Sequence, residues 1–99
     1  MWILKGSDES EAGAVTFRVT PGAIKTIGRA PRADFVLDAA MVSRLHCRLT
    51  ATAGDELEVL DLDSTNGTFV NGRRVRRSRL AAGDRLKVGR VELTVERAS

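Results

Sequence analysis

Short alternations of apolar and polar residues, separated by turn signals, organise this chain from end to end. Val15, Phe17 and Val19 alternate with two polar residues, as in a strand that buries one face. No window shows sustained helical periodicity, and only 78–82 could hold a helical turn. The pattern predicts about ten short strands, at 2–5, 15–19, 23–28, 34–37, 46–52, 57–62, 68–70, 73–75, 85–88 and 91–97.

Glycine-containing pairs separate many of these strands. The later ones are Gly54-Asp55, Asn71-Gly72, Gly83-Asp84 and Gly89-Arg90. Of these, Asn71-Gly72 is typical of a tight type I′ hairpin turn, because both of its residues tolerate positive φ. Many short strands at this spacing favour an all-β antiparallel sandwich or barrel.

Length and composition fit one small globular domain. The 99 residues are 42% hydrophobic and 29% charged, which is enough apolar material for one core. We expect a single domain over 1–99, with its core from about 2 to 97 and with Trp2 and Phe17 in or at the edge of that core. No apolar run is as long as a membrane span, and the beginning of the chain lacks the apolar segment of a signal peptide. The single cysteine, Cys47, excludes an internal disulfide and fits a reducing compartment, so a cytoplasmic location is expected.

The charge of the chain is moderately basic and is carried mostly by arginine. The net charge is +3, and thirteen of the sixteen basic residues are arginine. The guanidinium fork matches phosphate and carboxylate better than an ammonium does, so a phosphate-bearing partner is compatible with this balance. Five arginines lie close together at Arg73, Arg74, Arg76, Arg77 and Arg79. This cluster is either a solvated face or a surface that binds nucleic acid.

The segment 61–72, with the sequence DLDSTNGTFVNG, is the richest in side-chain hydrogen-bonding groups. Ser64, Thr65, Asn66 and Thr68 bring three hydroxyls and an amide to one predicted loop. We expect that loop to grip a polar ligand with several acceptor atoms.

Three motifs, taken together, resemble the forkhead-associated (FHA) domain. They are Gly28-Arg29, Ser43-Arg44-Leu45-His46 and the segment 63–72, followed by the Gly-Asp segment at 80–89. The resemblance covers nearly the whole chain. It implies an eleven-stranded β-sandwich with binding loops at one end, and a module that reads phosphothreonine in partner proteins downstream of a Ser/Thr kinase.

The resemblance also implies which residues bind the phosphothreonine. Arg29 corresponds to the arginine that pairs with the phosphate, and Ser43 and Thr65 correspond to hydroxyl donors to its oxygens. Asn66 corresponds to the residue that hydrogen-bonds the peptide backbone. Arg44 either adds a phosphate contact or lies on the surface.

Five further positions have supporting roles in the same comparison. His46 is expected to brace the binding loops without touching the phosphate, and Gly67 to supply an unusual backbone angle. Asn71 belongs to the hairpin turn and could brace a neighbouring loop. Gly89 is expected to help form the pocket for the threonine methyl. Met41 lies where the family contacts the third residue after the phosphothreonine, which favours an apolar residue there.

Other function classes find less support in the sequence. His46 and Cys47 are neighbours on a predicted strand and would point to opposite faces, and no nucleophile elbow, phosphate-binding P-loop or metal-ligand cluster is present. We therefore expect no enzyme activity, cofactor, metal or membrane partner. A nucleic-acid-binding β domain is the main alternative, although one Trp, three Phe and no Tyr are poor material for base stacking. A scaffold that binds an unphosphorylated partner is a second alternative.

One regulatory feature of some family members is not expected. Those members carry an N-terminal threonine motif that, once phosphorylated, closes onto their own binding site. Residues 1–14 contain no threonine, so no such self-closing switch is predicted.

Overall fold

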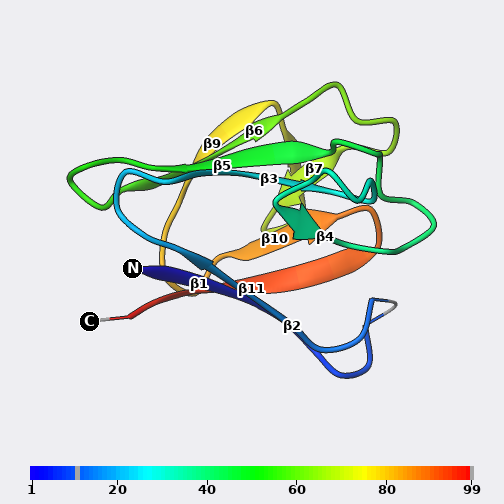
Figure 1. Cartoon of the computed structure of the whole chain (residues 1–99), viewed down its shortest axis with the longest axis horizontal. Helices are drawn as coiled ribbons and strands as arrows, with labels where there is room; N and C mark the ends of the chain where they lie inside the picture. Colours follow the sequence, from blue (N-terminus) through cyan, green and yellow to red (C-terminus); the bar gives the residue numbers. More distant parts are fainter. Residues whose placement is uncertain (11, 99) are drawn as a thin grey trace.

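The computed structural model describes residues 1–10 and 12–98, and strands form its framework (Figure 1). The eleven strands are β1 (Trp2–Gly6), β2 (Val15–Val19), β3 (Ile24–Gly28), β4 (Phe35–Val36), β5 (Cys47–Ala51), β6 (Leu57–Asp61), β7 (Thr68–Val70), β8 (Arg73–Val75), β9 (Arg77–Leu80), β10 (Arg85–Val88) and β11 (Val91–Arg97). No helix in the described residues is long and apolar enough to cross a membrane. Glu11, between β1 and β2, lies outside the described residues.

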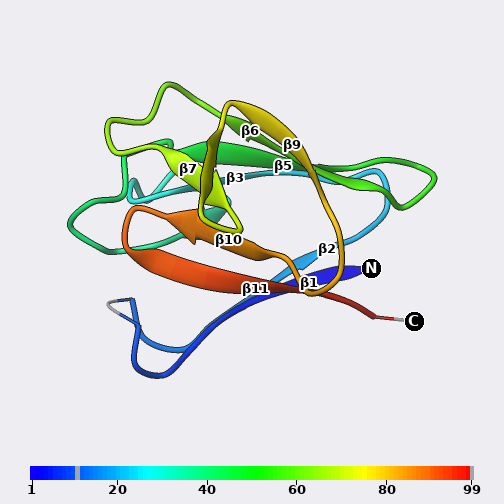
Figure 2. The ribbon, with the colours of Figure 1, turned by 180° about the vertical axis from the view of Figure 1, so that it is seen from behind.

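Two sheets packed face to face form the sandwich that the sequence predicts (Figures 1 and 2). One sheet has six strands in the order β2-β1-β11-β10-β7-β8, and the other has five in the order β4-β3-β5-β6-β9. All pairings are antiparallel except that of β3 with β4, which is parallel. Because β4 has only two residues, this pair does not need the long crossover of a full parallel pair.

The helical turn that the sequence allowed at 78–82 does not form, because Arg77–Leu80 form the edge strand β9. Leu80 is buried and lies opposite Leu57 of β6, whereas Arg77 and Arg79 are exposed. A strand of four residues with one apolar residue cannot show a two-residue period, so the sequence does not reveal this strand. The correction brings the strand count from ten to the eleven of the family fold.

Alternating side chains build the core between the sheets. In β11, Val91, Leu93 and Val95 are fully buried, while the residues between them face solvent. Trp2 and Phe17 are buried as predicted, and the Phe17 ring stacks on Phe35 of the other sheet at 4.5 Å between centroids. Such burial of one face per strand is the main source of stability in this architecture.

Cys47 is also buried, and burial raises the pKa of its thiol far above the usual value. The thiol is therefore held protonated and unreactive in the core.

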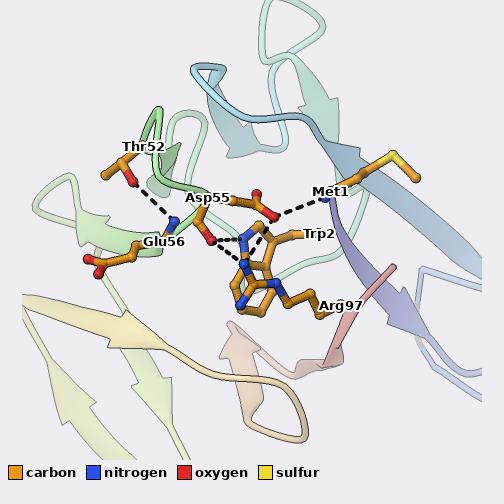
Figure 3. A network of polar contacts seen from close by, with 6 residues as sticks. All are labelled: Met1, Trp2, Thr52, Asp55, Glu56 and Arg97. Carbon is orange, nitrogen blue, oxygen red and sulfur yellow. Dashed lines mark hydrogen bonds and ion pairs between the residues drawn. The ribbon is translucent and has the colours of Figure 1, made fainter. Parts of the chain in front are cut away.

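The two ends of the sandwich differ in the segments they carry. At one end lie the loops 29–34, 37–46 and 62–67. At the other lie both chain termini and the β5–β6 turn (Figure 1). Asp55 of that turn binds the Met1 amine at 3.2 Å and the Arg97 guanidinium at 3.3 Å, and its carbonyl accepts the Trp2 indole N–H at 3.0 Å (Figure 3). Burial opposes ionisation of Asp55, but the two cations outweigh burial and lower its pKa. This network ties the ends of the chain to the fold.

Candidate functional site

A pocket of about 520 Å³ opens at the loop end of the sandwich. Residues from three loops line it: Arg29 from the first, Ala40, Met41, Val42, Ser43, Arg44 and Leu45 from the second, and Asp63, Thr65 and Asn66 from the third. All five residues predicted to bind phosphothreonine, and the predicted selectivity residue, thus border one cavity. These positions are far apart in sequence, and the ends of β3, β5, β6 and β7 bring them together.

The backbone around Arg29 is fixed against the second loop. The Arg29 N–H donates to the Ser43 carbonyl at 3.0 Å, and the Ala30 N–H donates to the Arg44 carbonyl at the same distance. Gly28 allows this approach, because a Cβ at that position would lie 2.0 Å from the Arg44 oxygen. The sequence motif contains Gly28, but its steric role becomes visible only in the structure.

Ser43 joins the second loop to the third. Its Oγ accepts the Thr65 N–H at 3.0 Å, so the hydroxyl proton remains available to a ligand. The Thr65 hydroxyl has no hydrogen bond within the described part of the chain and is likewise available. Two hydroxyl donors and the exposed Arg29 cation therefore border one pocket, which suits an anion with several oxygens.

His46 is fully buried and connects the same two loops from below. Its Nδ1 accepts the Ser43 N–H at 3.0 Å, so the proton lies on Nε2, which donates to the Gly67 carbonyl at 2.8 Å. Burial lowers the pKa of His46, and this effect exceeds the opposing influence of Gly67 and Asp61. The neutral imidazole therefore acts as a fixed spacer and does not line the pocket.

Two of the loop hydroxyls predicted to grip a ligand point inward instead. Ser64 is 7% exposed and Thr68 is fully buried. Their hydroxyls donate to one carboxylate oxygen of Asp61 at 2.5 and 2.7 Å, and Ser64 Oγ accepts the Gly67 N–H at 3.0 Å. Burial opposes ionisation of Asp61, but the hydroxyl donors outweigh it and lower its pKa. Asp61, which the sequence analysis did not select, organises the loop that presents Thr65.

The wall around Met41 is shaped from two sides. The Asn66 amide donates to the Met41 carbonyl at 3.0 Å, so in this structure that amide joins two loops. Gly89 has a φ of 61° and packs against Met41 so closely that a Cβ would lie 2.9 Å from its carbonyl carbon. Gly89 is absent from the pocket lining, so its influence on a threonine methyl pocket would pass through Met41.

The remaining two predicted residues, Gly67 and Asn71, both lie outside the lining of the pocket. Gly67 has a φ of 88°, the unusual backbone angle that was expected. Asn71 has a φ of 51° in its hairpin turn and binds Asp84 and the backbone of Arg85, both at 3.0 Å. It therefore braces the turn before β10, and it does not border the pocket.

Asp63 is a pocket residue that sequence reasoning missed. Its carboxylate is 94% exposed, and its φ is 55°, which is uncommon for a residue other than glycine. The nearest cation is Arg76 at 3.9 Å. Asp63 thus places a negative charge at the rim of an otherwise cationic pocket. Within the described residues, no group of three or more His, Cys, Asp or Glu could hold a metal ion.

Comparison with known proteins identifies the family. The model of the FHA domain matches residues 25–89, which include every pocket residue described above. The chain belongs to the FHA domain family. This membership agrees with the eleven strands of the sandwich and with the position of the pocket on its loops.

Two curated relatives are much longer than this chain. The chain is 42% identical over 81 residues to an ABC transporter ATP-binding/permease protein of Mycobacterium tuberculosis, covering 82% of the chain and 9% of the transporter. It is 41% identical over 66 residues to the glycogen accumulation regulator GarA of Mycolicibacterium smegmatis, covering 67% of the chain and 41% of GarA. The chain thus spans less than half of the length of either relative.

A solved structure agrees with the fold over nearly the full length. It comes from work on phosphothreonine-dependent FHA domain interactions and is 34% identical to the chain. The TM-score is 0.87, and the match covers 99% of the chain and 97% of the solved structure.

Proposed function

We propose that this FHA domain binds phosphothreonine-containing segments of partner proteins. The observation that carries the proposal is the convergence of Arg29 with the hydroxyls of Ser43 and Thr65 on one pocket. Phosphothreonine carries close to two negative charges and three strong acceptor oxygens at neutral pH. One fixed cation and two short donors from different loops match that group.

The expected strength suits a reversible interaction. Each charge-assisted hydrogen bond contributes roughly 1.5–3 kcal/mol. Three or four such bonds approach the value of about −8 kcal/mol that corresponds to a micromolar Kd. An unphosphorylated peptide would lose all of these bonds, so phosphorylation would act as the switch for binding.

Recognition of threonine over serine depends on one methyl group. Its burial contributes about 0.8 kcal/mol, and up to roughly 3 kcal/mol in a well-shaped pocket. Phosphoserine should therefore bind several-fold more weakly. Met41 offers an apolar surface for the third residue after the phosphothreonine, and we propose an apolar preference there.

The biological setting of the proposal follows from the ligand. A phosphothreonine ligand requires a Ser/Thr kinase upstream, and the domain would recruit or assemble the phosphorylated partner. We propose binding rather than catalysis, because the pocket offers a cation and hydrogen-bond donors without a paired nucleophile and base. We also propose a cytoplasmic location, since the single cysteine fits a reducing compartment.

A binding screen tests the proposal directly. Matched libraries of phosphothreonine, phosphoserine and unphosphorylated peptides would be titrated against the labelled domain by fluorescence anisotropy. We expect selection of phosphothreonine, with an apolar residue enriched three positions after it. Equal binding of the unphosphorylated library would show that the domain is a phosphorylation-independent scaffold. An acidic preference at that third position would contradict the role of Met41.

A further inference from the structure

The five clustered arginines occupy one long side of the sandwich, where both sheets end. Arg73 and Arg74 lie on β8, the last strand of the six-stranded sheet, and Arg77 and Arg79 lie on β9, the last strand of the five-stranded sheet. Arg76 connects the two strands where the chain crosses from one sheet to the other. We call these five residues the arginine strip.

The arginine strip keeps an excess of positive charge. Three members have acidic neighbours, in the ion pairs Arg77–Glu58 at 3.0 Å, Arg79–Glu56 at 3.8 Å and Arg76–Asp63 at 3.9 Å. The last two are near the outer limit for an ion pair, and the side chains of Arg76 and Arg79 are more than 80% exposed. Arg73 and Arg74 have no ion pair within the described residues. Exposed pairs of this kind are weak and can be exchanged for a partner's carboxylates.

A groove of about 510 Å³ lies between the two strands of the strip. Its lining is Val70, Asn71, Arg73, Val75, Ser78, Arg79 and Asp84. Val75, which is partly exposed, and the edge of the largely buried Val70 give the groove a small apolar floor within a mainly polar lining. Arg73 and Arg79 enter the lining from the edge strands of different sheets. Asp84 is already engaged by Asn71 and by the Ala81 N–H. The groove therefore combines room for an apolar side chain with flanking cations.

The strip begins beside the phosphate-binding loops. Arg76 lies next to Asp63 of the pocket, and the Arg74 Nε is 2.8 Å from the place where a Cβ on Gly67 would stand. From Arg76 the two strands run away from the pocket. A partner anchored by its phosphothreonine could therefore continue over Arg76 toward the groove without leaving the protein surface.

We propose that the arginine strip docks an acidic, partly apolar segment of the same protein whose phosphothreonine occupies the pocket. This inference rests on the proposed function. Carboxylates of the segment pair with Arg73 and Arg79, and one apolar side chain packs against Val70 and Val75. Because β9 is the last strand of its sheet, its outer edge can also accept an extended segment.

Nucleic acid fits the strip less well than an acidic protein segment does. Glu56, Glu58 and Asp63 are interspersed among the arginines and would repel a continuous row of phosphates. The strip contains no aromatic residue for base stacking. The groove has the size of a side-chain site and a small apolar floor at Val75, which a phosphate backbone would not use.

The experiment compares three phosphopeptides on three proteins. One peptide has a phosphothreonine flanked by neutral residues. The other two add a tail of about six alternating Glu and Val residues, roughly 20 Å when extended, one before and one after the phosphothreonine. The strip variant is R73Q/R79Q, and the control K5Q/R18Q removes two positive charges from the outer face of the six-stranded sheet. Kd values are measured at low and high salt.

We expect wild type and control to bind the acidic-tailed phosphopeptide roughly tenfold more tightly than the neutral one at low salt. The strip variant should bind both with the affinity of the neutral peptide. Equal gains in the strip variant, or no gain in wild type, would overturn the proposal. The proposal would also be overturned if a mixed-sequence DNA duplex bound wild type more tightly than R73Q/R79Q while the acidic tail gave no increase in phosphopeptide affinity.

A separate measurement distinguishes failure of the pocket from failure of the strip. If the neutral phosphopeptide does not bind wild type, the proposed function fails and the link to a phosphothreonine partner fails with it. The unphosphorylated acidic-tailed peptide then tests the strip alone. Its weaker binding to R73Q/R79Q than to K5Q/R18Q would support the acidic docking surface, and equal binding to both would overturn it.

Discussion

The two ends of the sandwich contain similar residue types but use them differently. At the terminal end, the Met1 amine and the Arg97 guanidinium both pair with the Asp55 carboxylate (Figure 3). At the loop end, the internal groups are also paired, but Arg29 and the Thr65 hydroxyl have no such partner within the described residues. Polar networks that close on themselves stabilise a fold, whereas a rigid network with unused donors at its surface is prepared for a ligand.

The largest expected difference between the ends concerns ligand binding. Arg29→Ala and Ser43→Ala should each weaken phosphothreonine-peptide binding by roughly 100-fold, because each removes a charge-assisted interaction. Anisotropy titration measures the Kd, and circular dichroism checks that the fold is kept. Arg18→Ala, an exposed arginine on β2, is the control and should bind normally. Wild-type affinity in both site variants would show that the pocket assignment is wrong.

A substitution behind the pocket should instead affect stability. Gly28→Ala forces a Cβ to within 2.0 Å of the Arg44 carbonyl, so the free energy of unfolding should fall by about 3 kcal/mol. Gly54→Ala is the matched control in the β5–β6 turn at the terminal end, where the nearest atom would be 3.8 Å away. Urea denaturation measures both. Equal stability of the two variants would mean that the loops can separate without cost.

The buried histidine makes stability at the loop end depend on pH. The folded pKa of His46 is lower than its unfolded value of 6.5, so below that value the unfolded state takes up more protons. Wild-type stability should therefore fall as pH decreases from 7 to 5, where the carboxylates of Asp55 and Asp61 remain ionised. Urea midpoints without peptide measure this slope. The His46→Gln variant should be less stable at pH 7, and its urea midpoint should change less with pH than that of wild type. The same dependence of the midpoint on pH in both proteins would contradict the role of His46.

The terminal network should influence stability without affecting recognition. Asp55→Asn keeps a residue that tolerates the φ of 61° but removes the charge that faces Met1 and Arg97. We expect a modest decrease in the urea midpoint and an unchanged Kd for phosphopeptide. A changed Kd would show that the two ends of the sandwich are coupled through the sheets.

The smallest effect is expected at the rim of the pocket. Asp63→Asn removes a negative charge near the phosphate position and should tighten phosphopeptide binding by about two- to threefold at low salt. Asp8→Asn, in the exposed loop after β1, changes the net charge equally and serves as the control. Isothermal titration calorimetry at two salt concentrations would measure both variants. Weaker binding in Asp63→Asn would show that this carboxylate holds the loop instead of repelling the ligand.

Alternation and turn signals predicted most strands and an all-β sandwich or barrel, because half-buried strands show a two-residue period, and the resemblance to the FHA domain pointed to the sandwich. They failed at β9, where three of four residues are polar, and at the parallel pairing of β4, whose two residues show no period. In the site, the motifs predicted the lining of the pocket. They could not show that Ser64 and Thr68 face inward, since irregular loops have no period that tells one side from the other.

The burial of Cys47 has a practical consequence for every experiment above. The chain contains one thiol, in the middle of the core, and it becomes accessible only when the two sheets separate. Its rate of modification by a small alkylating reagent therefore reports opening of the sandwich without an added probe. The alkylation rate of Cys47 therefore shows whether a variant that has lost affinity for its ligand has also lost its folded structure.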